Sequence, residues 1–129
     1  MGQHANDILY RALHQIRNAC TDQGILAGTI DADNYRRIWA RDGIVGGLAG
    51  ILSGDKIIIE GLGNTLSTLW KARDQKLGTI PSNVDPSGEQ VSFGSLVGRV
   101  DATTWFLVGA AQYIIQSNDL SGLEFLQKD

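Results

Sequence analysis

The chain has 129 residues, of which 43% are hydrophobic and 19% are charged, and its formal net charge is −3. This composition is typical of a soluble globular domain that can form a core, and it argues against a disordered chain. The mildly acidic balance gives no support for nucleic-acid binding, and the apolar stretches are shorter than the roughly 18 residues of a membrane span.

The first residues, 1–7, lack the basic and apolar regions of a signal peptide, so a cytoplasmic location is expected. The single cysteine, Cys20, excludes an internal disulfide. The spacing of His4, His14 and Cys20 is not that of a zinc site, and no glycine-rich loop follows a predicted βαβ strand. We therefore expect no metal and no cofactor.

The first and third predicted helices are amphipathic. The first is expected from a cap at Asn6 or Asp7 to about Thr21, and the third from about Lys56 to Gln75. In both, apolar residues recur at spacings of three and four, as on one face of a helix: Leu9, Leu13, Ile16 and Cys20 in the first, and Ile58, Leu62, Leu66 and Leu69 in the third. Each helix is expected to turn its other side toward water.

The second and fourth predicted helices have no polar face. The second begins near Asp42, which caps it or lies in its first turn, and its body covers residues 44–53. The fourth runs from Asp101 to about Ser117. Helices of this kind are expected to be buried on every side. Glycines within the second cost about 1 kcal/mol each relative to alanine, so we expect them to admit a neighbouring backbone or a ligand: Gly46, Gly47 and Gly50.

The segments between these helices are rich in turn formers. Residues 22–37 are expected to form a loop, with short extended pieces at 25–27 and 35–39. Residues 76–100 are predicted to form a long loop, and loops of this length in small domains are often functional. A fifth helix is predicted to begin at residues 120–125.

The order of helices, amphipathic then buried and again amphipathic then buried, predicts an all-α fold. In an α/α toroid, inner helices are enclosed on both sides and outer helices face solvent on one side. A four-helix bundle would instead show four amphipathic helices of similar character. We therefore predict that residues 1–129 form one partial α/α toroid of helical hairpins.

Two separated stretches carry family patterns. Residues 35–42 read Tyr-x-x-x-Trp-x-Arg-Asp, and Gly-x-Ile-Pro at 78–81 is followed by Gly-x-Val-Asp-Ala-Thr-x-Trp-Phe at 98–106. They resemble the first and second inner helices of (α/α)6-barrel glycoside hydrolases, such as bacterial glycogen-debranching enzymes, glucoamylases, and neutral or alkaline invertases. The resemblance covers nearly the whole chain but only the first third to half of such a barrel. It implies the N-terminal part of a glycosidase acting on α-glucosides.

The resemblance implies roles for particular residues. Asp101 matches the invertase motif that carries the general acid, and Arg41 with Asp42 matches a pair that binds sugar hydroxyls in the innermost subsite. Trp39 and Trp105 are candidates for stacking on a sugar face. Each has a structural alternative: a helix cap for Asp101, an ion pair with a cap for Arg41 and Asp42, and core packing for the two tryptophans.

Catalysis by this chain alone is not expected, because the second catalytic carboxylate of the family comes from a later helix. The expected ligand is an α-glucoside. An interpretation of a different class is a helical self-association module without catalytic activity. An incomplete toroid would expose inner-helix surface, which would favour a homo-oligomer.

Overall fold

A computed structural model of the chain describes residues 2–95, 100–117 and 124, and these residues are mostly helical. This agrees with the predicted all-α class, apart from several two-residue strands. The elements follow one another as α1 (Gln3–Ala19), β1 (Cys20–Thr21), β2 (Gly24–Ile25), β3 (Ile38–Trp39), α2 (Ala40–Ser53), α3 (Lys56–Lys71), β4 (Asn83–Val84), β5 (Val91–Ser92) and α4 (Asp101–Ser117).

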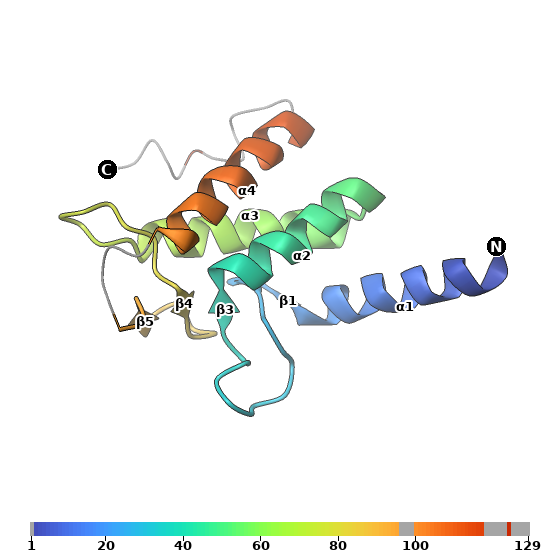
Figure 1. Cartoon of the computed structure of the whole chain (residues 1–129), viewed down its shortest axis with the longest axis horizontal. Coiled ribbons are helices and arrows are strands. Elements are labelled where there is room, and N and C mark those ends of the chain that lie inside the picture. The colour runs from blue at the N-terminus through green and yellow to red at the C-terminus, as the bar shows by residue number, and fades with distance from the viewer. Residues whose placement is uncertain (1, 96–99, 118–123, 125–129) are drawn as a thin grey trace.

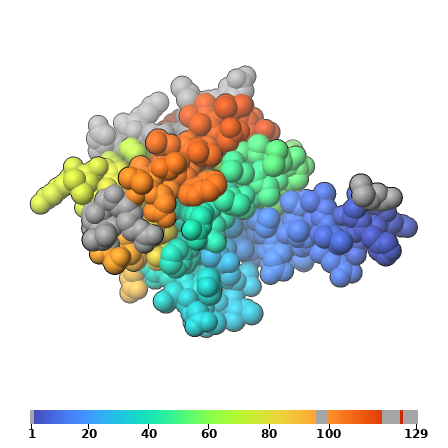
Figure 2. All heavy atoms as spheres, in the orientation of Figure 1, coloured from blue at the N-terminus to red at the C-terminus, as the bar shows by residue number. Residues whose placement is uncertain are grey.

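Three helices form the body of the molecule. Figure 1 shows α2 and α4 running in the same direction beside each other, with α3 running the opposite way against both. Helix α1 projects away from this body, and the space-filling view shows its N-terminal half surrounded by solvent (Figure 2). Only Ala19, the last residue of α1, is buried.

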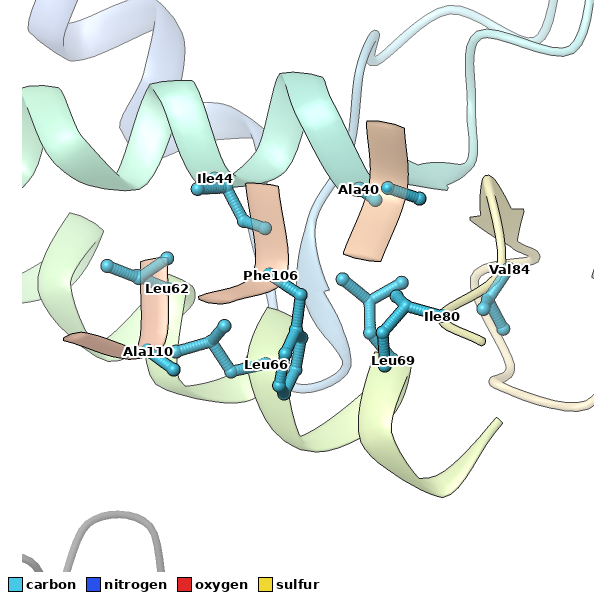
Figure 3. Packing of buried hydrophobic residues seen from close by; sticks show 10 residues of the cluster. Ala40, Ile44, Leu62, Leu66, Leu69, Ile80, Val84, Phe106 and Ala110 are labelled. Carbon is cyan, nitrogen blue, oxygen red and sulfur yellow. The ribbon is translucent and has the colours of Figure 1, made fainter. Parts of the chain in front are cut away.

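The core lies where α2, α3 and α4 meet. The predicted stripe of α3 is buried as expected, since Ile58, Leu62, Leu66 and Leu69 are all 0% exposed, whereas Lys56 and Glu60 on its other side face solvent. Figure 3 shows core side chains from the three helices and from the segment after α3 directed toward one another. This cluster comprises Ala40, Ile44, Leu62, Leu66, Leu69, Ile80, Val84, Ala102, Phe106 and Ala110.

The prediction that α2 and α4 are buried on every side is wrong for the chain as described. Each helix buries one face, and each exposes large apolar side chains on the other. Leu52 of α2 is 90% exposed, and Ile115 of α4 is 70% exposed. The reason is geometric: among the described residues, α2, α3 and α4 cover only the mutually facing sides of one another.

Of the three α2 glycines predicted to admit a close neighbour, Gly47 and Gly50 do so, whereas a Cβ atom on Gly46 would make only ordinary contacts. A Cβ atom placed on Gly47 would lie 2.6 Å from the Leu62 side chain of α3. A Cβ atom on Gly109 would lie 2.9 Å from Ile44, where α4 packs on α2. Because atoms at these distances overlap, any larger side chain would separate the helices.

The boundaries of α1 differ from the prediction. The helix begins at Gln3 rather than after a cap at Asn6 or Asp7, and it ends at Ala19 rather than near Thr21. It ends early because residues 20–21 pair with residues 24–25 in an antiparallel hairpin. The hairpin is held on α3, where Thr65 Oγ1 accepts a hydrogen bond from the Ile25 amide at 2.9 Å.

The boundaries of the other helices are closer to the prediction, except at the end of α3. Helix α2 begins at Ala40, so Asp42 lies in its first turn, which was one of the two predicted positions. Helix α3 begins at Lys56, as expected, and ends at Lys71 rather than Gln75. Helix α4 has the predicted bounds, and Asp101 is its first residue.

The predicted long loop is partly ordered by strand pairing. Strand β4 lies between β3 and β5 in an antiparallel sheet, so Trp39 is opposite Asn83, and Asn83 is opposite Ser92. The short extended pieces predicted before α2 and after Gly24 correspond to β3 and β2. The predicted fifth helix lies outside the described residues, apart from residue 124.

Candidate functional site

The N-terminal ends of α2 and α4 are attached to one segment of the chain. The Ala40 amide, at the start of α2, donates a hydrogen bond to the Ser82 carbonyl at 2.9 Å. The Ile80 amide donates to Thr103 Oγ1 in the first turn of α4 at 3.1 Å. Residues 80–82 therefore bring together two helix ends that are far apart in the sequence.

A small hollow of about 80 Å³ lies between these two helix ends. We call it the helix-end hollow, and it is lined by Trp39, Ala40, Arg41, Ser82, Asp101 and Ala102. It joins three of the five residues that the sequence singled out, because Trp39 and Arg41 come from one motif and Asp101 from the other. Neither motif, taken by itself, requires its residues to lie beside those of the other motif.

A second hollow, of about 300 Å³, lies beside the first and is called here the loop hollow. It is lined by Asp33, Asn34, Tyr35, Trp39, Arg41 and Asp42. Asp33 and Asn34 adopt left-handed conformations with φ of 52° and 64°, which these two residue types tolerate better than most. The turn brings the Asn34 carbonyl within 3.1 Å of Trp39 Nε1, which donates to it. This bond ties the indole of Trp39 to the loop.

A third hollow, of about 420 Å³, lies on the β3–β4–β5 side of Trp39 and is called the sheet hollow. It is lined by Asn34, Arg37, Trp39, Ser82, Asn83, Ser92 and Gly94. Sequence reasoning did not select its polar residues as site residues. Arg37 lies within the first motif, and Ser82 and Asn83 directly follow the Gly-x-Ile-Pro stretch. Their position within or directly after the motifs is therefore the sequence feature that could have identified these residues as site residues.

Arg41 and Asp42 are exposed and border more than one hollow. Both also line a larger depression of about 420 Å³ between α1, residues 25–29 and α2, whose other walls include Ile16, Ile25 and Leu26. No ion pair joins Arg41 to Asp42 in the described part of the chain. The alternative role predicted for this pair, a structural ion pair, therefore has no support among these residues.

Asp101 and Trp105 have surroundings that differ from the expected ones. The general-acid role that the resemblance implies for Asp101 needs water-poor surroundings, but Asp101 is exposed at the start of α4. Trp105 lies one turn later, is half-buried and packs against the core cluster. This position agrees with core packing, the alternative role predicted for Trp105. Stacking of Trp105 on a sugar stays a prediction.

The turn that joins β4 to β5 is organised by Asp85. Its carboxylate accepts hydrogen bonds from Ser87 Oγ and from the amides of Glu89 and Gln90. The Ser87 hydrogen bond lowers the pKa of Asp85, burial acts in the opposite direction, and the Gln90 and Glu89 amides lower it further. Asp85 therefore serves this turn, while the Glu89 side chain is exposed to solvent.

Metal-binding clusters and membrane-spanning helices are both absent from the described residues. Residues 2–95 and 100–117 contain no group of three or more His, Cys, Asp or Glu side chains placed to hold a metal ion. In the same ranges, no helix combines the length and the hydropathy needed to cross a bilayer. The hollows around Trp39 are therefore the candidate site.

Comparisons of this chain with models of protein families, with curated proteins and with solved structures find no match. The functional assignment accordingly depends on the motifs and on the geometry that joins them. That geometry consists of hollows that share Trp39, one of which is also lined by Arg41 and Asp101.

Proposed function

We propose that this chain forms one wall of a sugar-binding site and is the N-terminal part of a glycoside hydrolase acting on α-glucosides. One observation carries the proposal: Trp39, Arg41 and Asp101, from two separate motifs, line the same hollow. Chance resemblance of two short motifs would not require their key residues to meet in space.

The residue types at this hollow suit a sugar ligand. An indole face packs against the apolar C–H face of a pyranose, and its size and rigidity make this contact effective. A guanidinium and a carboxylate supply paired hydrogen bonds of the kind that neighbouring hydroxyls accept and donate. Arg41 and Asp42 are exposed at the start of α2, so both can reach a ligand above Trp39.

In the proposed enzyme, Asp101 is the general acid that protonates the leaving oxygen. A general acid must hold its proton when substrate binds, and water-poor surroundings favour that state. The described residues leave Asp101 exposed. The opposite wall of the complete site would cover Asp101 and supply the second carboxylate that glycoside hydrolysis needs. The 129-residue chain by itself therefore binds sugar weakly and hydrolyses little.

The arrangement of helices supports a toroid. In an α/α toroid, neighbouring inner helices run parallel, and the outer helix that connects them runs antiparallel behind both. Helices α2 and α4 are parallel neighbours, and α3 connects from the end of α2 back along both (Figure 1). The exposed apolar faces of α2 and α4 are the surfaces that further helices of a ring would cover.

Sugar binding can be tested by nuclear magnetic resonance on the ¹⁵N-labelled chain. The three tryptophan indole N–H signals are convenient probes, since Trp39 lines the hollows while Trp70 and Trp105 pack on the core. Maltose or isomaltose at millimolar concentrations is expected to shift the Trp39 signal and leave that of Trp70 unchanged.

Arg41→Ala should weaken this binding about tenfold or more, because hydrogen bonds to charged groups contribute about 1.5–3 kcal/mol. The matched control is Arg11→Ala, at an exposed arginine on α1. If none of these sugars shifts the Trp39 signal, or if both arginine variants behave alike, the proposal is wrong.

A second candidate function is self-association, and the exposed apolar side chains of α2 and α4 favour it. Leu107 is 64% exposed and Ile115 is 70% exposed on α4, while Leu52 is 90% exposed on α2. Exposed apolar side chains occur at protein interfaces where they form a patch. Tight oligomers that do not bind sugar would favour this function over the first.

A further inference from the structure

The sheet hollow adjoins the helix-end hollow and has a different chemical character. Trp39 and Ser82 line both hollows, so the two share part of their walls. The helix-end hollow holds the candidate acid, Asp101, whereas Arg37, Asn83 and Ser92 make the sheet hollow polar without a carboxylate among its described lining residues. A ligand that reaches past Trp39 would therefore meet hydroxyl, amide and guanidinium groups.

Several of these groups keep hydrogen-bonding capacity toward the hollow. Asn83 is 5% exposed, and its Oδ1 accepts from Arg37 Nε at 2.6 Å, while its Nδ2 has no hydrogen-bond partner among the described residues. Ser92 Oγ accepts from the Gly94 amide at 3.2 Å, which leaves its own hydrogen available. Asn83 Nδ2 and the Ser92 hydroxyl hydrogen are therefore donors that a ligand in the sheet hollow could engage.

Protein contacts hold these groups in place before any ligand binds. Arg37 donates through Nε to Asn83 and through Nη2 to the Gln90 carbonyl at 2.9 Å, so its guanidinium is held across β4 and the turn before β5. Asn83 is paired with Trp39 on one side and with Ser92 on the other. Binding would thus require little ordering of side chains, which favours affinity.

We propose that the sheet hollow is a second sugar subsite, in which the unit next to that bound at the helix-end hollow lies beyond Trp39. The inference rests on the proposed function and deepens it by assigning an oligosaccharide, rather than a single sugar, to this wall. An inorganic anion is the competing ligand, because Arg37 has no acidic partner in the described residues. The aromatic wall and the neutral donors favour the sugar.

The test compares methyl α-glucoside, which occupies one subsite, with maltose and isomaltose, which reach both. Maltose or isomaltose should bind more tightly and should shift backbone signals of residues 83–84 and 91–92 that methyl α-glucoside leaves unchanged. Ser92→Ala should weaken disaccharide binding about three- to tenfold, the effect of one lost hydrogen bond, and leave methyl α-glucoside binding unaltered. Ser92→Thr keeps the hydroxyl and should retain most of the affinity. Ser95→Ala, at an exposed serine outside the hollow, is the control.

The outcomes separate this inference from the proposed function. If methyl α-glucoside binds at Trp39 but disaccharides bind no more tightly and leave β4 and β5 unchanged, the second subsite is refuted while the proposed function stands. If inorganic phosphate, and no sugar, shifts the β4 and β5 signals, the hollow is an anion site and the inference is wrong. If no sugar binds anywhere, both fail.

Discussion

Trp39 lies directly opposite Asn83 in the antiparallel pairing of β3 and β4. One residue further on, the Ala40 amide donates to the Ser82 carbonyl, so the first turn of α2 begins where the strand pairing ends. This relationship places the first motif against the segment that leads into the second. The candidate site therefore depends on two-residue strands as much as on the long helices.

The buried contact between Arg37 and Asn83 should be important for stability. Asn83→Ala would remove the acceptor of Arg37 Nε and leave a half-buried guanidinium without one of its partners. The expected loss is about 1–3 kcal/mol in the free energy of unfolding, measured by urea denaturation. Asn18→Ala, on the exposed side of α1, should lower the free energy of unfolding much less. Equal stability of the two variants would mean that the sheet does not depend on this bond.

The packing of α2 on α3 predicts that the same substitution has different effects on stability at two adjacent glycines. Gly47→Ala would place a Cβ atom 2.6 Å from the Leu62 side chain, and overpacking of this kind costs about 1–3 kcal/mol. At Gly46, the nearest atom would be 3.6 Å away, which is ordinary contact, so Gly46→Ala should be neutral or stabilise by up to about 1 kcal/mol through helix propensity. Thermal unfolding of both variants measures the difference. Similar melting temperatures would contradict the close approach of the helices.

The sequence alone predicts those parts of the fold that have a local signal. The stripe of α3 follows helical periodicity, and the glycines of α2 have no purpose in an isolated helix, so both could be interpreted correctly. The exposed faces of α2 and α4 could not be predicted, because an apolar pattern does not say how many neighbours cover it. Strand β4 has two residues and no periodicity, so only its pairing with Trp39 reveals it.

The residues of the candidate site also differ in whether the sequence alone could identify them. Trp39, Arg41 and Asp101 were selected from their motifs, and the helix-end hollow brings them together. Ser92 could not be selected, because it lies near Trp39 only through the pairing of β3, β4 and β5, whereas Arg37 lies within the first motif and was passed over. Trp105 was selected by its motif, and its packing against the core depends on how α4 lies on α3.

Asp55 should make the attachment of α1 sensitive to acid. Its carboxylate caps α3 by accepting from the amides of Ile57 and Ile58, and it also forms an ion pair with Arg17 of α1. Burial raises the pKa of Asp55, but the Arg17 hydrogen bond, the Ile58 amide, the charge of Arg17 and the Ile57 amide outweigh burial and lower it. A carboxyl group whose folded pKa lies below its unfolded value stabilises the fold above the unfolded value, near 3.9, and loses this contribution as pH falls through the folded pKa.

Urea unfolding should therefore show stability declining below about pH 4. Asp55→Asn can still cap the helix but has no charge to lose, so its profile should be flatter in this range. Asp22→Asn, in an exposed turn, is the matched control and should follow the original profile. Parallel profiles for all three proteins would show that Asp55 does not link α1 to α3.

The exposed apolar faces of α2 and α4 give the last prediction, which concerns self-association. Leu52→Lys and Ile115→Lys each place a charge on one of these faces, where the original side chains are 90% and 70% exposed. If two copies associate through these faces, both variants should shift sedimentation equilibrium toward the monomer, because burying an unpaired charge is costly. Ile30→Lys is the control, since Ile30 is 76% exposed in the loop before β3 and lies on neither helix. Monomers at all concentrations in the unmodified chain would rule out the self-association module. They would leave standing the proposal that further helices of a toroid pack on these faces.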